Sequence, residues 1–95
     1  MDLPTPATLT ANGSYDIPGC TRGAEYLIAL KGTFGGATVA LHMPLGANNV
    51  FEQVEGGSWT AAVEDTAISA GTTNRLVVSG ATGTTAIAVT FQELK

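Results

Sequence analysis

The sequence has little charge, and basic residues are especially scarce. Only 13% of its 95 residues are charged, against about 25% in an average soluble domain. Four basic residues stand against eight acidic ones, and the formal net charge is −4. The bases are scattered along the chain, at Arg22, Lys31, Arg75 and Lys95. Because sequence-independent binding to DNA or RNA requires clustered Lys and Arg, we expect no nucleic-acid partner.

Residues with reactive side chains are also few. A single cysteine, Cys20, cannot form an internal disulfide, which is typical of chains made and kept in cytosol. His42 is the only histidine, so a zinc site would lack its usual ligands, and a Cys20–His42 nucleophile pair would need a third, orienting group. We therefore expect no metal, no cofactor and no enzymatic activity. Cys20 is interpreted as a small buried or loop thiol, and His42 as a residue on the solvent face of a strand.

The acidic residues do not form a recognisable catalytic or calcium-binding pattern. Glu52, Glu55, Glu64 and Asp65 lie near one another in sequence. A glycosidase would need two carboxylates opposed across a cleft, and an EF-hand would need its own ligand spacing. We interpret these carboxylates as solvated faces of strands.

The chain also lacks long apolar runs. No stretch approaches the roughly 20 apolar residues that a membrane-spanning helix requires. The start, MDLPTPA, has acid and proline where a secretory signal has basic residues followed by an apolar run. We therefore expect no membrane partner and synthesis in the cytoplasm. The low charge has two explanations that stay open: a threonine-coated surface, or a subunit that buries much of its surface against neighbours.

What the sequence does contain is β-strand patterns divided by Gly, Pro and Asn. Strands are predicted over 24–31, 37–43, 65–69, 74–79 and 84–91, because these segments alternate or are β-branched. Hairpins are predicted over 7–17, closed by Asn12-Gly13, and over 49–64, around Gly56-Gly57. The whole predicts an all-β fold, a small antiparallel β-sandwich or barrel of about seven to nine short strands.

One domain is expected over residues 9–95, preceded by an extended N-terminal arm over residues 1–8. The arm is predicted because its prolines, Pro4 and Pro6, fix φ and push the preceding residues to extended conformations. Such an arm is able to reach a neighbouring subunit. Leu3, Pro4, Pro6 and Thr8 are therefore candidate contact residues.

An internal repeat relates two parts of the chain. EYLIALKGTFGGATVALHM (25–43) aligns with NRLVVSGATGTTAIAVTFQ (74–92) when one residue is deleted after the first strand. Both copies read as apolar strand, Gly-x-x-Gly corner and apolar strand, and the glycines suit the positive φ of a short connection. A phosphate-binding loop would instead require GxxxxGK[ST] leading into a helix. The repeat therefore predicts two similar hairpins rather than a ligand loop.

Two aromatic residues have alternative roles. Phe34, at the tip of the first corner, either folds over the end of the sandwich or contacts a neighbour. Trp59 follows Gly56-Gly57-Ser58 and is either a core anchor or, if exposed, an interface hot spot or a platform for a sugar. Both are candidate contact residues.

The segments EYLIALKGTFGGATVALHM, FEQVEGGSWTAAV and RLVVSGATGTTAIAVTF, within residues 25–91, resemble small virion proteins of tailed bacteriophages. In those proteins a GTFGGATV-type hairpin, a GG-x-W turn and a final SGATGTT strand pair recur in this order. This chain departs from the pattern after Met43, where PLGANNVFEQVEGGSW replaces a shorter Gly/Asp-rich segment.

The resemblance implies a structural role in the virion. Such proteins are all-β, commonly trimeric, and serve as capsid decoration (cement) subunits, head fibres or tail pieces. We therefore expect a capsid decoration protein that binds the major capsid protein as a homo-oligomer on the outer surface of the head. The alternatives are a head-fibre or tail component that binds a host glycan, and a separate sugar-binding β-sandwich module.

Overall fold

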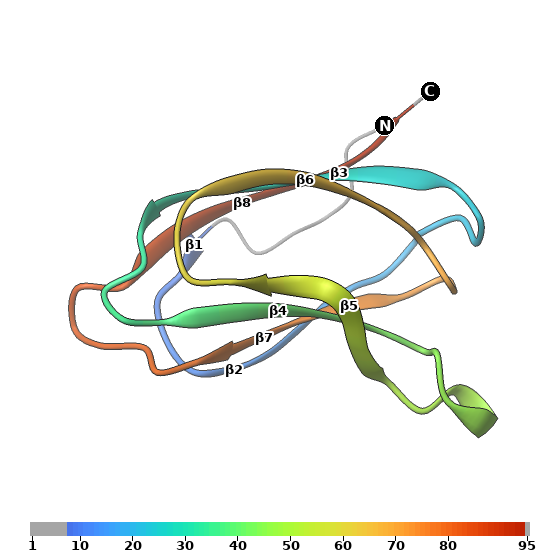
Figure 1. Ribbon diagram of the computed structural model, residues 1–95, viewed down its shortest axis with the longest axis horizontal. Helices are drawn as coiled ribbons and strands as arrows, with labels where there is room; N and C mark the ends of the chain where they lie inside the picture. Colours follow the sequence, from blue (N-terminus) through green and yellow to red (C-terminus); the bar gives the residue numbers. More distant parts are fainter. Residues whose placement is uncertain (1–7, 95) are drawn as a thin grey trace.

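The computed structural model describes residues 8–94 and is all-β (Figure 1). Besides one 3-10 turn, η1 (Ala47–Asn49), it contains eight strands: β1 (Thr8–Leu9), β2 (Gly13–Ile17), β3 (Glu25–Thr33), β4 (Thr38–Met43), β5 (Glu52–Trp59), β6 (Val63–Ile68), β7 (Asn74–Ser79) and β8 (Ala86–Glu93). The strands form two four-stranded sheets, β1-β8-β3-β6 and β2-β7-β4-β5, and all their pairings are antiparallel. The predicted antiparallel β-sandwich is confirmed.

The core lies between the two sheets and follows the predicted alternation. Tyr26, Ile28 and Leu30 of β3 are fully buried. On β8 the buried residues Ile87, Val89 and Phe91 alternate with exposed Ala86, Ala88 and Thr90. The rings of Tyr26 and Phe91, on neighbouring strands, stack with centroids 5.1 Å apart. Apolar side chains from the inner faces of both sheets pack against one another in this way and hold the two layers together.

The connections between strands differ from the prediction. The segment 7–17 is not a hairpin, because β1 pairs with β8 in one sheet and β2 pairs with β7 in the other. Asn12 instead lies where the chain crosses between the sheets, and its side-chain Oδ1 accepts a hydrogen bond from Ala81 N at 2.8 Å. A local turn signal such as Asn-Gly does not determine which sheet the next strand joins.

The predicted hairpin over 49–64 is also wrong. Gly56 and Gly57 lie inside the continuous strand β5, which pairs with β4, while β6 pairs with β3 in the opposite sheet. The two glycines form a bulge: Ala40 pairs with Ser58 and His42 with Gln53, so four residues of β5 lie opposite one residue of β4. Gly56 has a φ of 76°, which only glycine adopts without strain.

The internal repeat forms two arches rather than two hairpins. We call an arch a pair of consecutive strands that lie in opposite sheets; β3–β4 is one arch and β7–β8 is the other. β3 pairs with β8, and β4 pairs with β7. Exchanging the two arches reproduces the same pairings, so the sequence repeat corresponds to a two-fold arrangement at the centre of the sandwich. The prediction of two hairpins is wrong because each Gly-x-x-Gly corner carries the chain across the core.

The corners of the two arches lie side by side at one end of the molecule (Figure 1) and are joined by threonine hydroxyls. Thr82 Oγ1 donates to the carbonyl oxygen of Gly35 at 2.8 Å, and Thr85 Oγ1 donates to that of Phe34 at 2.8 Å. Gly35 has a φ of 60°, and a Cβ there would lie 2.6 Å from Thr84 Oγ1. The glycine is therefore required both by its backbone conformation and by the closeness of the second corner.

Candidate functional site

Of the two aromatic contact candidates, one lies in the core of the sandwich and the other packs against it. Phe34 is only 7% exposed and lies in the hydrophobic cluster, so it closes the end of the sandwich. Trp59 is half-buried and packs against that cluster; its strand partner is Val39. Of the two roles open for each residue, the structure favours the core.

The N-terminal candidates are placed only in part. Thr8 is exposed and belongs to β1, where it pairs with Ala88 of β8. Leu3, Pro4 and Pro6 lie outside the described residues. Thr8 thus belongs to the sheet, and an extended arm before it stays a prediction.

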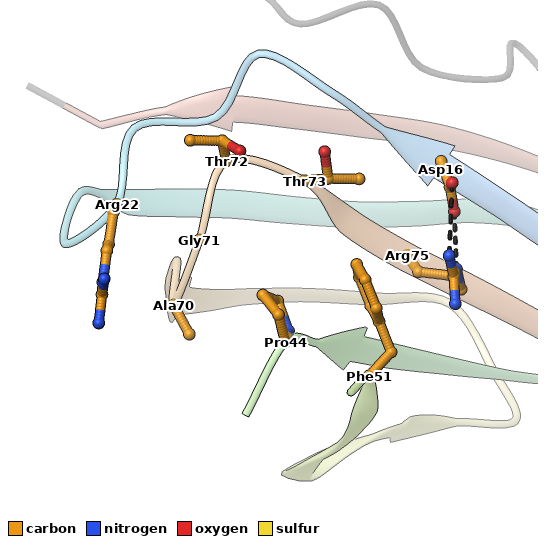
Figure 2. A pocket seen from close by; sticks show the side chains of 9 residues that line it. All are labelled: Asp16, Arg22, Pro44, Phe51, Ala70, Gly71, Thr72, Thr73 and Arg75. Atoms are coloured by element: carbon orange, nitrogen blue, oxygen red, sulfur yellow. Dashed lines mark hydrogen bonds and ion pairs between the residues drawn. The ribbon is translucent and has the colours of Figure 1, made fainter. Parts of the chain in front are cut away.

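A pocket of about 490 Å³ lies at the end of the sandwich opposite the arch corners, and Figure 2 shows it from close by. Its wall comes from four parts of the chain: the end of β2 with the loop that follows it, the loop after β4, the loop between β6 and β7, and the start of β7. The lining residues are Asp16, Arg22, Pro44, Phe51, Ala70, Gly71, Thr72, Thr73 and Arg75. We call this the arginine pocket, because it is lined by both arginines of the chain.

Arg75 is held in place on two sides. Its Nε donates to Asp16 Oδ1 at 2.7 Å, and its Nη2 lies 3.5 Å from Asp16 Oδ2. Its guanidinium carbon lies 4.0 Å from the centre of the Phe51 ring, which is a cation–π contact. The hydrogen bond from Arg75 lowers the pKa of Asp16 below its ordinary value, and the same bond raises the pKa of Arg75. The Asp16–Arg75 pair is therefore charged at neutral pH.

Two of the pocket loops, the one after β2 and the one between β6 and β7, are joined by backbone hydrogen bonds. Cys20 N donates to Thr72 O at 2.9 Å, Gly23 N to Ser69 O at 2.8 Å, and Ser69 N to Ala24 O at 2.9 Å. Thr21 N donates to the hydroxyl of buried Tyr26 at 2.7 Å, which fixes the first loop to the core. The loop that carries Arg22 is thus anchored on both sides of that residue.

A buried polar cluster also links the two loops. Asn74 is fully buried, and its Nδ2 donates to Cys20 Sγ at 2.9 Å and to Ser69 Oγ at 3.2 Å. Ser69 Oγ in turn donates to Gly71 O at 2.6 Å, within the pocket wall. Burial raises the pKa of the Cys20 thiol, although its hydrogen bonds with Asn74 and Ser69 oppose the shift. The thiol is therefore neutral and structural, which agrees with the interpretation of Cys20 as a small buried thiol.

One wall of the pocket continues into an exposed apolar loop. The segment between β4 and β5 carries Pro44 and Phe51 in the pocket wall, while Leu45 and Val50 are 51% and 56% exposed. In Figure 1 this segment, which includes η1, extends away from the two sheets. Pro44 closes over Gly71, because a Cβ at Gly71 would lie 2.6 Å from Pro44 Cγ. This loop is the segment in which the chain departs from the phage-protein pattern.

Sequence reasoning did not find the arginine pocket. In the sequence Arg22 and Arg75 are isolated basic residues that lie far apart. They line opposite ends of one pocket because β2 pairs with β7, which brings the loop after β2 beside the loop before β7. Among the described residues, no group of three or more His, Cys, Asp and Glu side chains is placed to hold a metal ion.

His42 and Cys20 also lie in separate environments. The thiol contacts Ile17 and Asn74, whereas His42 is on β4, opposite Arg75 on one side and Gln53 on the other. Within residues 8–94, no helix has the length and apolarity to cross a membrane.

Comparison with known proteins gives no relative. No family model, no curated protein and no solved structure matches the chain. The resemblance to phage virion proteins therefore stays a prediction from the quoted motifs.

Proposed function

We propose that the chain is a structural protein of a tailed-phage virion, a capsid decoration protein that binds and stabilises the assembled head as an oligomer. The motifs that resemble the phage proteins, GTFGGATV and SGATGTT, occupy the two interlocked arches. The resemblance therefore covers the central framework of the sandwich, and the loop between β4 and β5 is the segment that departs from it.

The outer face of the sheet β1-β8-β3-β6 is the observation that carries the proposal. Apart from three charged residues, Glu25, Lys31 and Glu64, its exposed side chains are small, apolar or hydroxyl-bearing, with Ile68 64% exposed at one edge. They include Ala86, Ala88 and Thr90 of β8 and Thr66 of β6. Two of the three charges neutralise each other: Lys31 of β3 and Glu64 of the edge strand β6 form an ion pair whose atoms lie 3.0 Å apart. Subunit interfaces are depleted in charge in this way, and we assign this face to contacts with neighbouring copies of the chain.

Decoration proteins act by mass action rather than by chemistry. A ligand that binds only the assembled state stabilises that state, and the full footprint of a decoration oligomer exists only on the completed shell. Many weak contacts distributed over the head then oppose its disassembly. The expected partner is the major capsid protein, and the expected oligomer is a trimer by resemblance.

The proposal is tested by the oligomeric state of the chain and of a face variant. Light scattering of the purified protein is expected to give an oligomer, and Ala88→Glu, at the centre of the face, is expected to dissociate it. Val50→Glu is the matched control, because Val50 is exposed on the loop between β4 and β5 and not on this face. A wild-type monomer, or equal dissociation by both variants, would contradict the proposed role of the face.

Binding to heads tests the role of the arm. Purified heads lacking the protein are mixed with the full chain or with a variant that begins at Thr8, which leaves β1 intact. The full chain is expected to sediment with heads, and the truncated one to bind more weakly. Equal binding by the truncated chain would remove the arm from the account.

A second candidate is a head-fibre or tail component that binds a host glycan, and the arginine pocket is the observation that favours it. Phe34 is buried in the core and Trp59 is half-buried against it, which leaves less of either ring exposed for stacking on a sugar. If the chain has this role, the pocket is the better candidate for the glycan site.

A further inference from the structure

The arginine pocket concentrates positive charge on an acidic protein. The chain carries a net charge of −4. The pocket nevertheless contains two guanidinium groups, Arg22 and Arg75, and a single carboxylate, Asp16. Its balance is therefore one positive charge, opposite in sign to the rest of the molecule, and this favours an anionic ligand.

The two guanidinium groups are used differently. Asp16 occupies one edge of Arg75 and Phe51 covers one of its faces, so Arg75 is oriented and partly neutralised. Arg22, at the far end of the pocket in Figure 2, has no ion-pair partner among residues 8–94. Since a guanidinium presents a planar fork of donors that matches a carboxylate or phosphate, Arg22 is the group left to receive an anion.

Between the arginines the wall is mixed in character. Pro44, Phe51 and Ala70 supply apolar surface on one side of the lining, and Thr72 and Thr73 supply hydroxyl groups on the other (Figure 2). Asp16 adds a carboxylate acceptor at the Arg75 end. A six-membered sugar ring has this same division, with C–H groups on its faces and hydroxyl groups around its rim. The volume of about 490 Å³ is within the range of small-ligand sites.

From this arrangement we propose that the arginine pocket binds an acidic sugar, with the anionic group at Arg22 and the ring against Pro44 and Phe51. The sugar hydroxyls are received by Thr73 and by the Asp16–Arg75 pair. The acid is a carboxylate or a phosphate, because each offers two oxygen atoms that can accept parallel hydrogen bonds from a guanidinium. This inference does not depend on the chain being a capsid decoration protein.

The frame around the pocket supports binding without large rearrangement. The loops after β2 and before β7 are joined by three backbone hydrogen bonds, with Asn74 between them. Arg75 is fixed by Asp16 and Phe51 before any ligand arrives. Preorganised groups lose less entropy on binding, so even a monosaccharide is expected to bind measurably.

The test is a titration followed by backbone amide NMR shifts at fixed ionic strength. The probes are glucuronate, glucose 6-phosphate, neutral glucose and acetate. Shifts confined to residues around Arg22, Phe51 and Thr72 are expected with the two acidic sugars. Glucose and acetate are each expected to bind at least about tenfold more weakly, because each lacks one half of the recognised chemistry.

Arg22→Gln tests the anion site without disturbing the fold, because Arg22 is an exposed loop residue and its loss leaves the core intact. It is expected to weaken glucuronate binding about tenfold. Lys31→Gln is the matched control, since Lys31 is a base on β3 whose ion-pair partner is Glu64, outside the pocket. It is expected to leave the affinity unchanged.

Each other outcome overturns the proposal. Equal binding of glucose and glucuronate would remove the role of Arg22, and equal binding of acetate would reduce the pocket to a general anion site. Absence of shifts around the pocket with either acidic sugar, or an equal effect of the two substitutions, would refute the assignment altogether.

Discussion

Thr85 Oγ1 donates a hydrogen bond to the carbonyl oxygen of Phe34 across 2.8 Å, although the two residues are 51 positions apart. The same oxygen of Thr85 accepts a hydrogen bond from Thr82 N at 2.9 Å. Thr85 is buried, so water does not compete for these groups. The Thr85 side chain therefore pairs with a backbone amide of its own corner and also joins that corner to the corner of the other arch.

Replacing Thr85 with valine keeps the shape of the side chain and removes both hydrogen bonds. Thr82 N then loses its partner at a part-buried position. We expect the free energy of unfolding to fall by about 1–3 kcal/mol, the usual cost of leaving a buried polar group unpaired. Urea denaturation measures the change. Thr60→Val, at an exposed residue in the turn between β5 and β6, is the control and is expected to be close to neutral; equal effects of the two variants would contradict the role given to Thr85.

Gly35→Ala and Gly83→Ala compare equivalent glycines of the two corners. Gly35 has a φ of 60°, and a Cβ there would meet two threonine hydroxyls within 3 Å, whereas nothing lies within 4 Å of a Cβ at Gly83. We expect Gly35→Ala to destabilise the protein by more than about 1 kcal/mol and Gly83→Ala to have little effect. Thermal unfolding of the two variants side by side tests this, and a larger loss at Gly83 would contradict the described packing of the corners.

Phe34→Ala tests whether this aromatic residue belongs to the core. Since Phe34 is 7% exposed, its truncation leaves a cavity at the end of the sandwich, and a loss of about 3 kcal/mol or more is expected. Val50→Ala, at an exposed apolar residue, is expected to change stability by less than about 0.5 kcal/mol. A Phe34→Ala variant as stable as the wild type would mean that the ring does not fill the core.

The Asp16–Arg75 pair predicts a pH dependence at the acidic end. The pKa of Asp16 is lowered in the folded protein, below an ordinary value of 3.8. Its contribution to stability is therefore present above pH 3.8 and is lost as the pH falls through the lower, folded pKa. Denaturation of wild type and Asp16→Asn from about pH 6 down to about pH 2 is expected to show a stability difference that disappears in acid. A difference that grew as the pH fell would contradict the assignment.

Strand positions were predictable from the sequence because alternation is a local property. Val39, Leu41 and Met43 repeat at the period of a strand, and all three are buried. Strand partners were not predictable in the same way. Asn12-Gly13 and Gly56-Gly57 carry hairpin signals, yet the first lies at a crossing between sheets and the second is a bulge inside β5.

The candidate site was hidden for a related reason. The residues of the arginine pocket come from segments that only the β2–β7 and β4–β7 pairings bring together. The spacing of Arg22, Phe51 and Arg75 in the sequence does not predict that they line one pocket. The exposure of Phe34 was similarly undetermined, since a corner that crosses the core and a hairpin tip have the same glycine pattern.

The most direct test of the proposed function is an electron cryo-microscopy map of virions purified from cells that produce this chain. The account predicts density for the eight-stranded sandwich on the outer surface of the head, in contact with the major capsid protein and with other copies of the chain. Density in the tail alone, or particles without the chain, would contradict it.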